Sequence, residues 1–247
     1  MKVLFSPSEA KSSIAYAAKI DKNSFCFPEL YDKRLYIVKI YIDFLQKTSV
    51  ENLKKFFGLK NESECIKYRD TDLLNSATSK VIERYSGVAY NYLDYPSLRK
   101  DAKDWIDKNT IIFSNLFGPL KADDLIPLYK YKQNSTINGF KPELFYKEHF
   151  STSIDSYLKD DVIVDLRASF YEKFYKIKQP YITLKFIKNS KVVSHWAKAY
   201  RGLVLRYLAM NKVNSIKDFE SINFQNLKIT EILERGYKKE YIFEICT

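Results

Sequence analysis

The sequence predicts a fold between α/β and mixed α+β, in which a mixed β-sheet is flanked by helices. Apolar, β-branched runs of strand length alternate along the chain with longer segments of helical periodicity. Hydrophobic residues make up 46% of the 247 residues, which is sufficient for a packed core. The few glycines and prolines form no linker, so we expect one compact domain spanning residues 1–247.

The first part of the chain contains one clear strand and several expected helices. Residues 2–6 form a short apolar run stopped by Pro7, which is typical of a buried strand that ends in a loop. Apolar residues at helical spacing predict a long amphipathic helix at 28–46. Further helices are expected at 50–57 and 73–85, and a structured loop at 85–92.

The middle of the chain predicts a strand followed by a helix-hairpin-helix-like element. A helix at 98–108 precedes the β-branched strand 110–114. In 115–127 a short apolar turn, a break at Gly118 and a capping aspartate then indicate two short helices. Backbone N–H groups at such a hairpin could meet a phosphate beside Lys121. Tyrosines then alternate with lysines, including Lys130. This pattern is typical of a nucleic-acid-binding segment, and equally of an edge strand whose charges prevent aggregation.

The last part of the chain alternates helices and strands again. We expect helices at 142–158, 168–175, 194–207 and 215–220, and strands at 161–167, 181–188 and 240–245.

Positive charge is concentrated between residues 167 and 212. The whole chain carries 41 basic and 30 acidic residues, whereas this stretch contains eleven basic residues and one acidic residue. A local excess of one sign points to a partner of the opposite sign. The basic residues are Arg167, Lys173, Lys176, Lys178, Lys185, Lys188, Lys191, Lys198, Arg201, Arg206 and Lys212.

A helical projection places three of these cations on one face of the expected helix 194–207. Lys198, Arg201 and Arg206 share this face, with Gly202 between them. Small residues between cations leave the backbone open to a close ligand, so we expect an anion-binding surface. The alternatives are an ordinary solvated face, or a structural ion-pair network around Asp165, Arg167 and Arg201.

Several classes of protein are disfavoured by composition. No window approaches the ~20 apolar residues of a membrane span, and the start has no signal-peptide pattern. Three widely spaced cysteines and two histidines form no disulfide framework and no metal-spaced cluster. We therefore expect a cytoplasmic protein with no metal, no cofactor and no membrane partner, and infer no protein partner.

An enzyme pocket is the alternative to a nucleic-acid surface. Ser6 and Lys11 follow the first strand, and Asp165 ends another, so these residues could meet where the carboxyl ends of parallel strands form a crevice. With Lys198 and Arg201 they would form a pocket for an anionic or nucleotide-like small molecule. The residues by themselves identify no catalytic activity.

The motifs resemble those of the YaaA family of peroxide-stress-resistance proteins. Leu4-Phe5-Ser6-Pro7 is similar to the family's strand followed by Ser-Pro, with Lys11 two residues later than the family's lysine. The segment 85–93, which contains Tyr90, resembles an aromatic-x-Gly-x-x-Tyr-x-x-Leu pattern. Residues 113–130 resemble a Leu-Ser-Gly-Leu-Tyr-Gly-x-Leu-Arg block, and 164–171 an Asn/Asp-Leu segment. The most specific match is Ala-Lys-x-x-Arg-Gly-x-x-x-Arg at residues 197–206.

The resemblance implies a cytoplasmic, DNA-binding protein of YaaA-type fold that limits iron-driven damage during peroxide stress. It implies a helix-hairpin-helix element and a positively charged cleft, with DNA bound largely without sequence specificity, as duplex or junction-like DNA. The expected DNA-contacting or anion-contacting residues are Lys198, Arg201, Arg206, Gly202, Lys121, Lys130, Gly118 and Arg167. The expected pocket residues are Ser6, Lys11, Tyr90 and Asp165.

Overall fold

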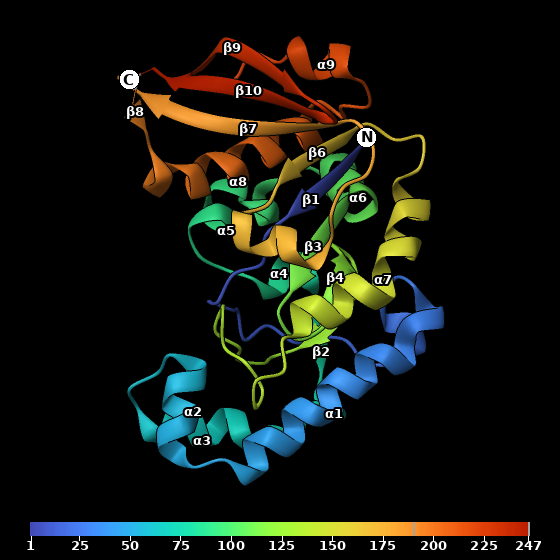
Figure 1. Ribbon diagram of the computed structural model, residues 1–247, viewed down its shortest axis with the longest axis vertical. Coiled ribbons are helices and arrows are strands. Elements are labelled where there is room, and N and C mark those ends of the chain that lie inside the picture. Colours follow the sequence, from blue (N-terminus) through green and yellow to red (C-terminus); the bar gives the residue numbers. More distant parts are fainter. Residues whose placement is uncertain (190, 247) are drawn as a thin grey trace.

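The computed structural model describes residues 1–189 and 191–246, and its centre is a mixed, eight-stranded sheet (Figure 1). The strand order is β4-β3-β1-β6-β7-β10-β9, and β8 pairs with β7. The strands of this sheet are β1 (Lys2–Phe5), β3 (Thr110–Ser114), β4 (Gly118–Lys121), β6 (Ile163–Leu166), β7 (Tyr181–Lys188), β8 (Lys191–Val192), β9 (Leu227–Arg235) and β10 (Lys238–Ile245). The fold class predicted from the sequence is confirmed.

Strands β3, β1, β6, β7 and β10 are parallel neighbours, whereas β4, β8 and β9 pair with their neighbours antiparallel. In β1, Val3, Leu4 and Phe5 are fully buried, as expected for a parallel strand covered on both faces. Two further strands, β2 (Thr78–Lys80) and β5 (Leu125–Pro127), form a separate antiparallel pair.

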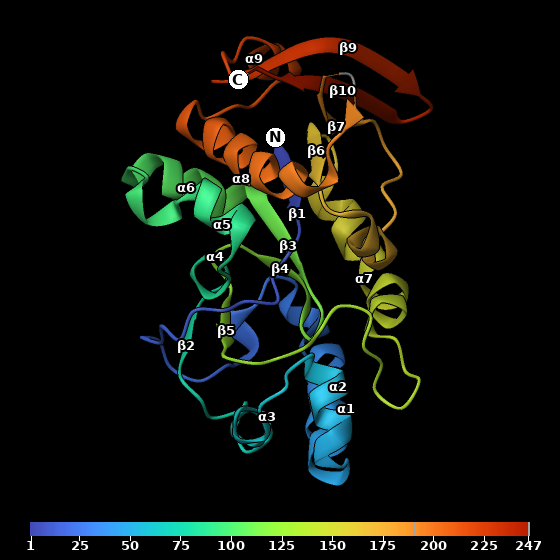
Figure 2. The ribbon, with the colours of Figure 1, turned by 90° about the vertical axis from the view of Figure 1, so that its left-hand side faces the viewer.

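Helices cover both faces of the central sheet (Figure 2). Helices α5 (Val88–Leu93), α6 (Lys100–Asn109) and α8 (Ser194–Met210) lie on one face, and α7 (Pro142–Leu158) lies on the other. Helices α1 (Tyr31–Lys47), α2 (Val50–Phe57) and α3 (Glu62–Arg69) form the lower end of the molecule (Figure 1). The remaining helical segments are α4 (Val81–Arg84), α9 (Ile216–Glu220) and the 3₁₀ turns η1 (Lys22–Ser24), η2 (Pro28–Leu30), η3 (Tyr95–Ser97) and η4 (Ser169–Phe174).

The helix-hairpin-helix prediction for residues 115–127 is wrong. Gly118–Lys121 is strand β4, paired with β3, and Leu125–Pro127 is strand β5. Asp124 caps no helix; its carboxylate accepts hydrogen bonds from the backbone N–H groups of Cys26 and Lys121. Two short helices joined by a tight turn are found instead at α2 and α3, where Gly58 is in the left-handed region with φ 68°.

Other differences lie where local patterns were weak. The expected helix 73–85 is strand β2 followed by the single turn of α4, and the expected loop 85–92 contains helix α5. The expected helix 168–175 is instead the 3₁₀ segment η4, Ser169–Phe174. Helix α3 and strand β9 were not predicted; α3 is only eight residues long, and β9 is mostly exposed along its length.

Candidate functional site

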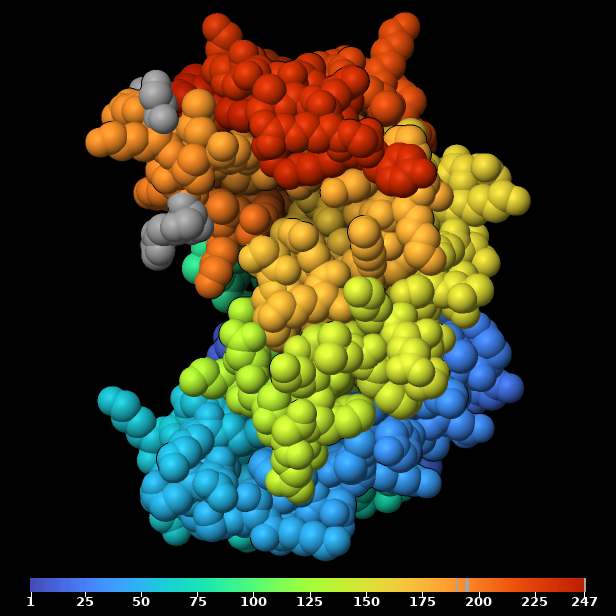
Figure 3. Space-filling model, viewed as in Figure 1, coloured from blue at the N-terminus to red at the C-terminus, as the bar shows by residue number. Residues whose placement is uncertain are grey.

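A cavity of about 400 Å³ lies where strands β1 and β6 end. It is lined by residues 5–9 after β1, by 88–90 at the start of α5, by parts of 166–171 after β6, and by Gln133, Lys198 and Arg201. We call it the carboxyl-end pocket, because ligand crevices in parallel sheets form at the carboxyl ends of strands. In Figure 3 this side of the molecule is hollowed, between the orange segment above and the cyan α2–α3 region below.

Hydrogen bonds hold three separate segments together in the pocket wall. The Ser6 hydroxyl accepts from the Ala168 N–H at 2.8 Å, which joins β1 to β6. The Tyr90 hydroxyl donates to the Ser6 carbonyl at 2.9 Å, which joins α5 to the same point. The Tyr90 ring also contacts Phe5 edge to face, with ring centroids 5.6 Å apart. Ser6 and Tyr90 therefore meet here, although 84 residues separate them.

Lys11 lies next to this wall in an aromatic setting. Its ammonium donates to the Ser8 carbonyl at 3.2 Å and lies 4.2 Å from the centroid of the Tyr129 ring. The Tyr129 hydroxyl is in turn hydrogen-bonded to Ser114 and Tyr85. Burial, and then the nearby positive charge of Lys130, lower the pKa of Lys11 to about 7. Its ammonium therefore loses its proton far more readily than that of an exposed lysine.

Arg201 is the main charged group that faces the carboxyl-end pocket. It is largely buried, and burial lowers the pKa of its guanidinium. No hydrogen bond or ion pair joins the Arg201 guanidinium to any residue within 1–189 or 191–246. Lys198, one turn earlier on α8, is exposed and also lines the pocket.

Asp165 and Arg167, both expected at the site, are occupied with each other instead. Arg167 donates from Nε and from a terminal nitrogen to the two Asp165 oxygens, each at 2.8 Å. Both side chains are buried, and Arg167 also donates to the carbonyls of Tyr171 and Tyr175. The expected pocket carboxylate is therefore not available to a ligand, and Arg167 is not exposed to a phosphate. Asp165 and Arg167 therefore form the ion pair expected in the structural-network alternative, but Arg201 is not part of it.

Part of the expected anion-binding face of α8, at Gly202 and Arg206, is a contact between two helices. A Cβ at Gly202 would lie 1.9 Å from the Ala89 carbonyl oxygen, so glycine lets α8 pack directly on α5. Arg206 donates to the carbonyls of Leu93 and Asp94 at 2.9 Å, which satisfies the end of α5. Gly202 and Arg206 therefore contact helix α5 and are not open to a ligand.

The other expected cations and Gly118 lie outside the carboxyl-end pocket. Gly118 is buried with φ 71°, and a Cβ there would lie 2.3 Å from the Tyr146 ring. Lys121 forms an ion pair with Asp123 at 3.2 Å. Lys130 is half-buried beside Lys11, and its carbonyl accepts a hydrogen bond from a tyrosine.

Gln133 is a pocket residue that sequence reasoning missed. Gln133 is in a loop with no periodicity or motif that could have indicated it. Glu9 was visible just beyond the first strand, but nothing local showed that it accepts a hydrogen bond from the Gln133 N–H at 3.0 Å. Among residues 1–189 and 191–246, no three His, Cys, Asp or Glu side chains gather as a metal site would require. Within the same residues no helix is both long and apolar enough to span a bilayer.

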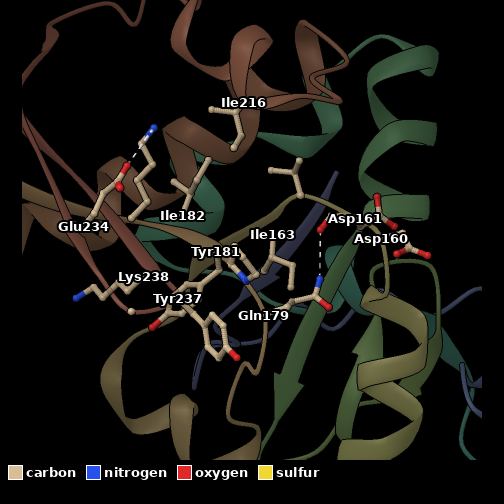
Figure 4. Close-up of a pocket in the computed structure, with 14 residues that line it drawn as sticks. Asp160, Asp161, Ile163, Gln179, Tyr181, Ile182, Ile216, Glu234, Tyr237 and Lys238 are labelled. Carbon is tan, nitrogen blue, oxygen red and sulfur yellow. Dashed lines mark hydrogen bonds and ion pairs between the residues drawn. The ribbon is translucent and has the colours of Figure 1, made fainter.

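A second cavity, of about 470 Å³, lies at the opposite ends of the parallel strands (Figure 4). We call it the amino-end pocket; it is lined by the first residues of β6, β7 and β10 and by the β9–β10 turn. Figure 4 shows Gln179 bonded to the backbone of Asp161 and Glu234 paired with a lysine. Asp161 also binds the amino terminus of Met1 at 2.9 Å. Its polar groups are thus largely paired with one another.

Comparison of the sequence with known protein families identifies the family to which this chain belongs. The family model described as "Peroxide stress protein YaaA" matches residues 1–233. The chain belongs to the YaaA peroxide stress protein family. The resemblance drawn from the sequence motifs is therefore confirmed.

Relatives of this YaaA-family chain extend over nearly its full length. An uncharacterized protein of Campylobacter jejuni is 46% identical over 245 residues, which cover 99% of each chain. A UPF0246 protein of Corynebacterium glutamicum is 30% identical over 220 residues, 86% of each chain. A UPF0246 protein of Fusobacterium nucleatum is 26% identical over 251 residues, 98% of each chain.

Proposed function

We propose that this YaaA-family protein binds DNA through the phosphate backbone, largely without reading its sequence. This binding would be the means by which it limits iron-dependent oxidative damage during peroxide stress. The observation that supports DNA binding is a group of cations, gathered on one side of the molecule, that have no carboxylate partner among the described residues. Contacts from such cations position a nucleic acid without specifying its sequence.

Ion pairing divides the basic stretch into two sets. Four of its cations have carboxylate partners: Arg167 with Asp165, Lys178 with Asp155, Arg206 with Asp94 and Lys212 with Asp101. Within the described chain the other seven have none. Four of these seven lie at the end of β7, on β8 and in the first half of α8, and we call them the cation group: Lys188, Lys191, Lys198 and Arg201. Figure 1 shows β8 and the start of α8 together at the left of the molecule.

In Figure 3 the orange segment, which includes the start of α8, borders the hollow. Lys198 and Arg201 line the pocket that opens there, and Lys188 and Lys191 extend the positive surface along the neighbouring hairpin. Clefts lined by charges of one sign focus the electrostatic field and attract ligands of the opposite sign. A DNA strand along this side would meet phosphate-binding groups at its rim and the carboxyl-end pocket at its base.

A salt series on labelled duplex and four-way-junction DNA tests the proposal. Affinity should fall steeply as salt increases, because bound lysines and arginines release counterions. The triple variant Lys188→Ala/Lys191→Ala/Lys198→Ala should bind more weakly. Its slope of log affinity against log salt should be shallower by about one for each lost contact.

The matched control is Lys33→Ala/Lys39→Ala/Lys159→Ala. It removes the same charge from exposed lysines on α1 and at the end of α7. The control should bind both DNAs as the wild type does. Equal weakening in the two triple variants would show that net charge alone is responsible, and a flat salt response in the wild type would contradict DNA binding.

A further inference from the structure

Arg201 is a partly buried cation whose guanidinium forms no hydrogen bond and no ion pair in the described chain. The nearest carboxylates that act on its pKa are Asp165 and Glu172, but both Asp165 oxygens are already bound by Arg167. A charge that is removed from water without a partner is costly, so such groups are retained where a ligand completes them. A guanidinium presents paired donors that match a phosphate or carboxylate.

The pocket that Arg201 faces also has an aromatic and apolar wall. Phe5, Tyr90 and Tyr171 line it, and the Tyr90 ring is fixed by its hydroxyl bond to Ser6 and its edge contact with Phe5. A fixed ring of this kind is a surface on which a planar base can stack. An anion site next to such a wall suits a ligand with a flat ring at one end and a phosphate at the other.

Polar groups able to recognise the edge of a ring complete the lining. One Glu9 oxygen accepts from the Gln133 backbone, and no bond to the other is found in the described chain. The Ser6 hydroxyl accepts from Ala168 and can still donate its own hydrogen. A free carboxylate oxygen can accept from an amino group of a base, and a hydroxyl can donate to a ring nitrogen.

We propose that the carboxyl-end pocket binds a single nucleoside monophosphate unit, with its phosphate on Arg201 and its base against Tyr90. The volume of about 400 Å³ is in the range of small-ligand pockets and excludes a duplex. The unit can be a free mononucleotide or one nucleotide extruded from a bound strand; the second source rests on the DNA binding proposed above. Proteins that act on one base of a duplex reach it by such extrusion.

Titration with deoxyadenosine monophosphate, adenosine and inorganic phosphate tests the pocket without DNA. The purified wild-type chain should bind the monophosphate at least ~10-fold more tightly than either part alone, because each part fills only half of the site. Arg201→Met should lose at least ~10-fold of the affinity for the monophosphate, while its affinity for adenosine stays the same. Glu9→Gln should lower the affinity for both adenosine and the monophosphate, because both contain the base.

The second arm distinguishes the two sources of the nucleotide. A duplex with one bulged 2-aminopurine should change its fluorescence on binding to the wild-type protein, and excess deoxyadenosine monophosphate should reverse the change. Arg201→Met also removes one member of the cation group, so it should bind this duplex more weakly. At protein concentrations that fully shift the duplex in a gel, it should still leave the fluorescence unchanged. If the wild type binds the monophosphate but the 2-aminopurine fluorescence does not change, the ligand is a free nucleotide. If the fluorescence changes but the free monophosphate does not bind, the ligand is a nucleotide extruded from the bound strand.

Failure of this inference is separable from failure of DNA binding. The inference is overturned if the wild type binds no monophosphate and also leaves the bulged base unchanged while it shifts the duplex. It is equally overturned if Arg201→Met binds the monophosphate as the wild type does. A wild type that binds the monophosphate but no DNA at low salt would contradict only the proposed function. Thermal unfolding of each variant verifies that it is folded.

Discussion

The two cavities at opposite ends of the parallel strands have similar volumes and different chemistry. The amino-end pocket is the larger, at about 470 Å³ against about 400 Å³. In it, Asp161 binds the amino terminus, Glu234 is close to Lys239, and Gln179 donates to backbone carbonyls. In the carboxyl-end pocket Arg201 is partly buried and has no partner among the described residues. Volume therefore does not distinguish the two cavities, whereas a partly buried cation without a partner among the described residues does.

The cavities at the two ends of the sheet are built from different kinds of segment. Three segments distant in sequence converge at the carboxyl-end pocket, after β1, after β6 and at the start of α5, and α8 crosses them. The amino-end pocket is closed by the local β9–β10 turn and by loops that precede strands. Substitutions matched between the two ends can therefore test how much each arrangement contributes to stability.

The largest difference is expected when a carboxylate is neutralised at each end. Asp165→Asn removes the charge that pairs with buried Arg167 beneath the carboxyl-end pocket, and should lower the free energy of unfolding by about 3–5 kcal/mol. Glu234→Gln, at an exposed pair 3.7 Å long in the amino-end pocket, should change it by less than about 1 kcal/mol. Urea unfolding measures both, and equal losses would remove the distinction.

The next effect concerns one glycine near each pocket. A Cβ at Gly202 would lie 1.9 Å from the Ala89 carbonyl, so Gly202→Ala should separate α8 from α5 and destabilise by about 3 kcal/mol. Gly236 lies in the β9–β10 turn beside the amino-end pocket, with φ 57° and open space around it. Gly236→Ala should therefore lower the free energy of unfolding by only about 1 kcal/mol. Melting temperatures in the reverse order would contradict the close helix packing.

A smaller, pH-dependent effect is expected from Lys11. Burial lowers its pKa in the folded chain to about 7 from the ordinary value of 10.5. Between these pH values the unfolded chain binds a proton that the folded chain lacks. The free energy of unfolding should therefore rise with pH, by about 2 kcal/mol between pH 7 and 9. Below pH 7 both forms are protonated and the folded form bears the whole cost of burying the charge.

Lys11→Met should flatten this rise, because no proton is then exchanged at the site. Lys238→Met, at the half-exposed rim of the amino-end pocket, is the matched control and should keep the wild-type curve. Denaturant unfolding at several pH values measures all three proteins. A variant curve parallel to that of the wild type would show that Lys11 is not the group responsible.

The smallest effect is expected for Arg201 itself. Arg201→Met removes a partly buried charge that lacks a partner in the described chain, so the free energy of unfolding should stay the same or increase by up to about 1 kcal/mol. Arg206→Met, five residues later, removes donors from the Leu93 and Asp94 carbonyls and should cost about 1–2 kcal/mol. A large loss of stability in Arg201→Met would indicate a structural role and would weaken the case for a ligand.

Much of the fold was predictable because it depends on local patterns. The apolar run before Ser6, the β-branched strand at Thr110–Ser114 and the periodicity of Pro142–Leu158 each determine their own element. The prediction for residues 115–127 was wrong because a Gly-Pro break is compatible both with a turn between two helices and with a turn between two strands. Pairing of β4 with β3 decided between them.

The sequence by itself determined the α/β class, the family motifs and the concentration of positive charge between residues 167 and 212. Tertiary structure alone decided which of those charges remain unpaired. Arg206 and Arg201 look equivalent on a helical projection, but Arg206 meets the end of α5, more than 100 residues earlier in the chain. Arg201 meets a cavity. Periodicity specifies the face of a helix, whereas the partner of that face depends on long-range packing, which no local pattern contains.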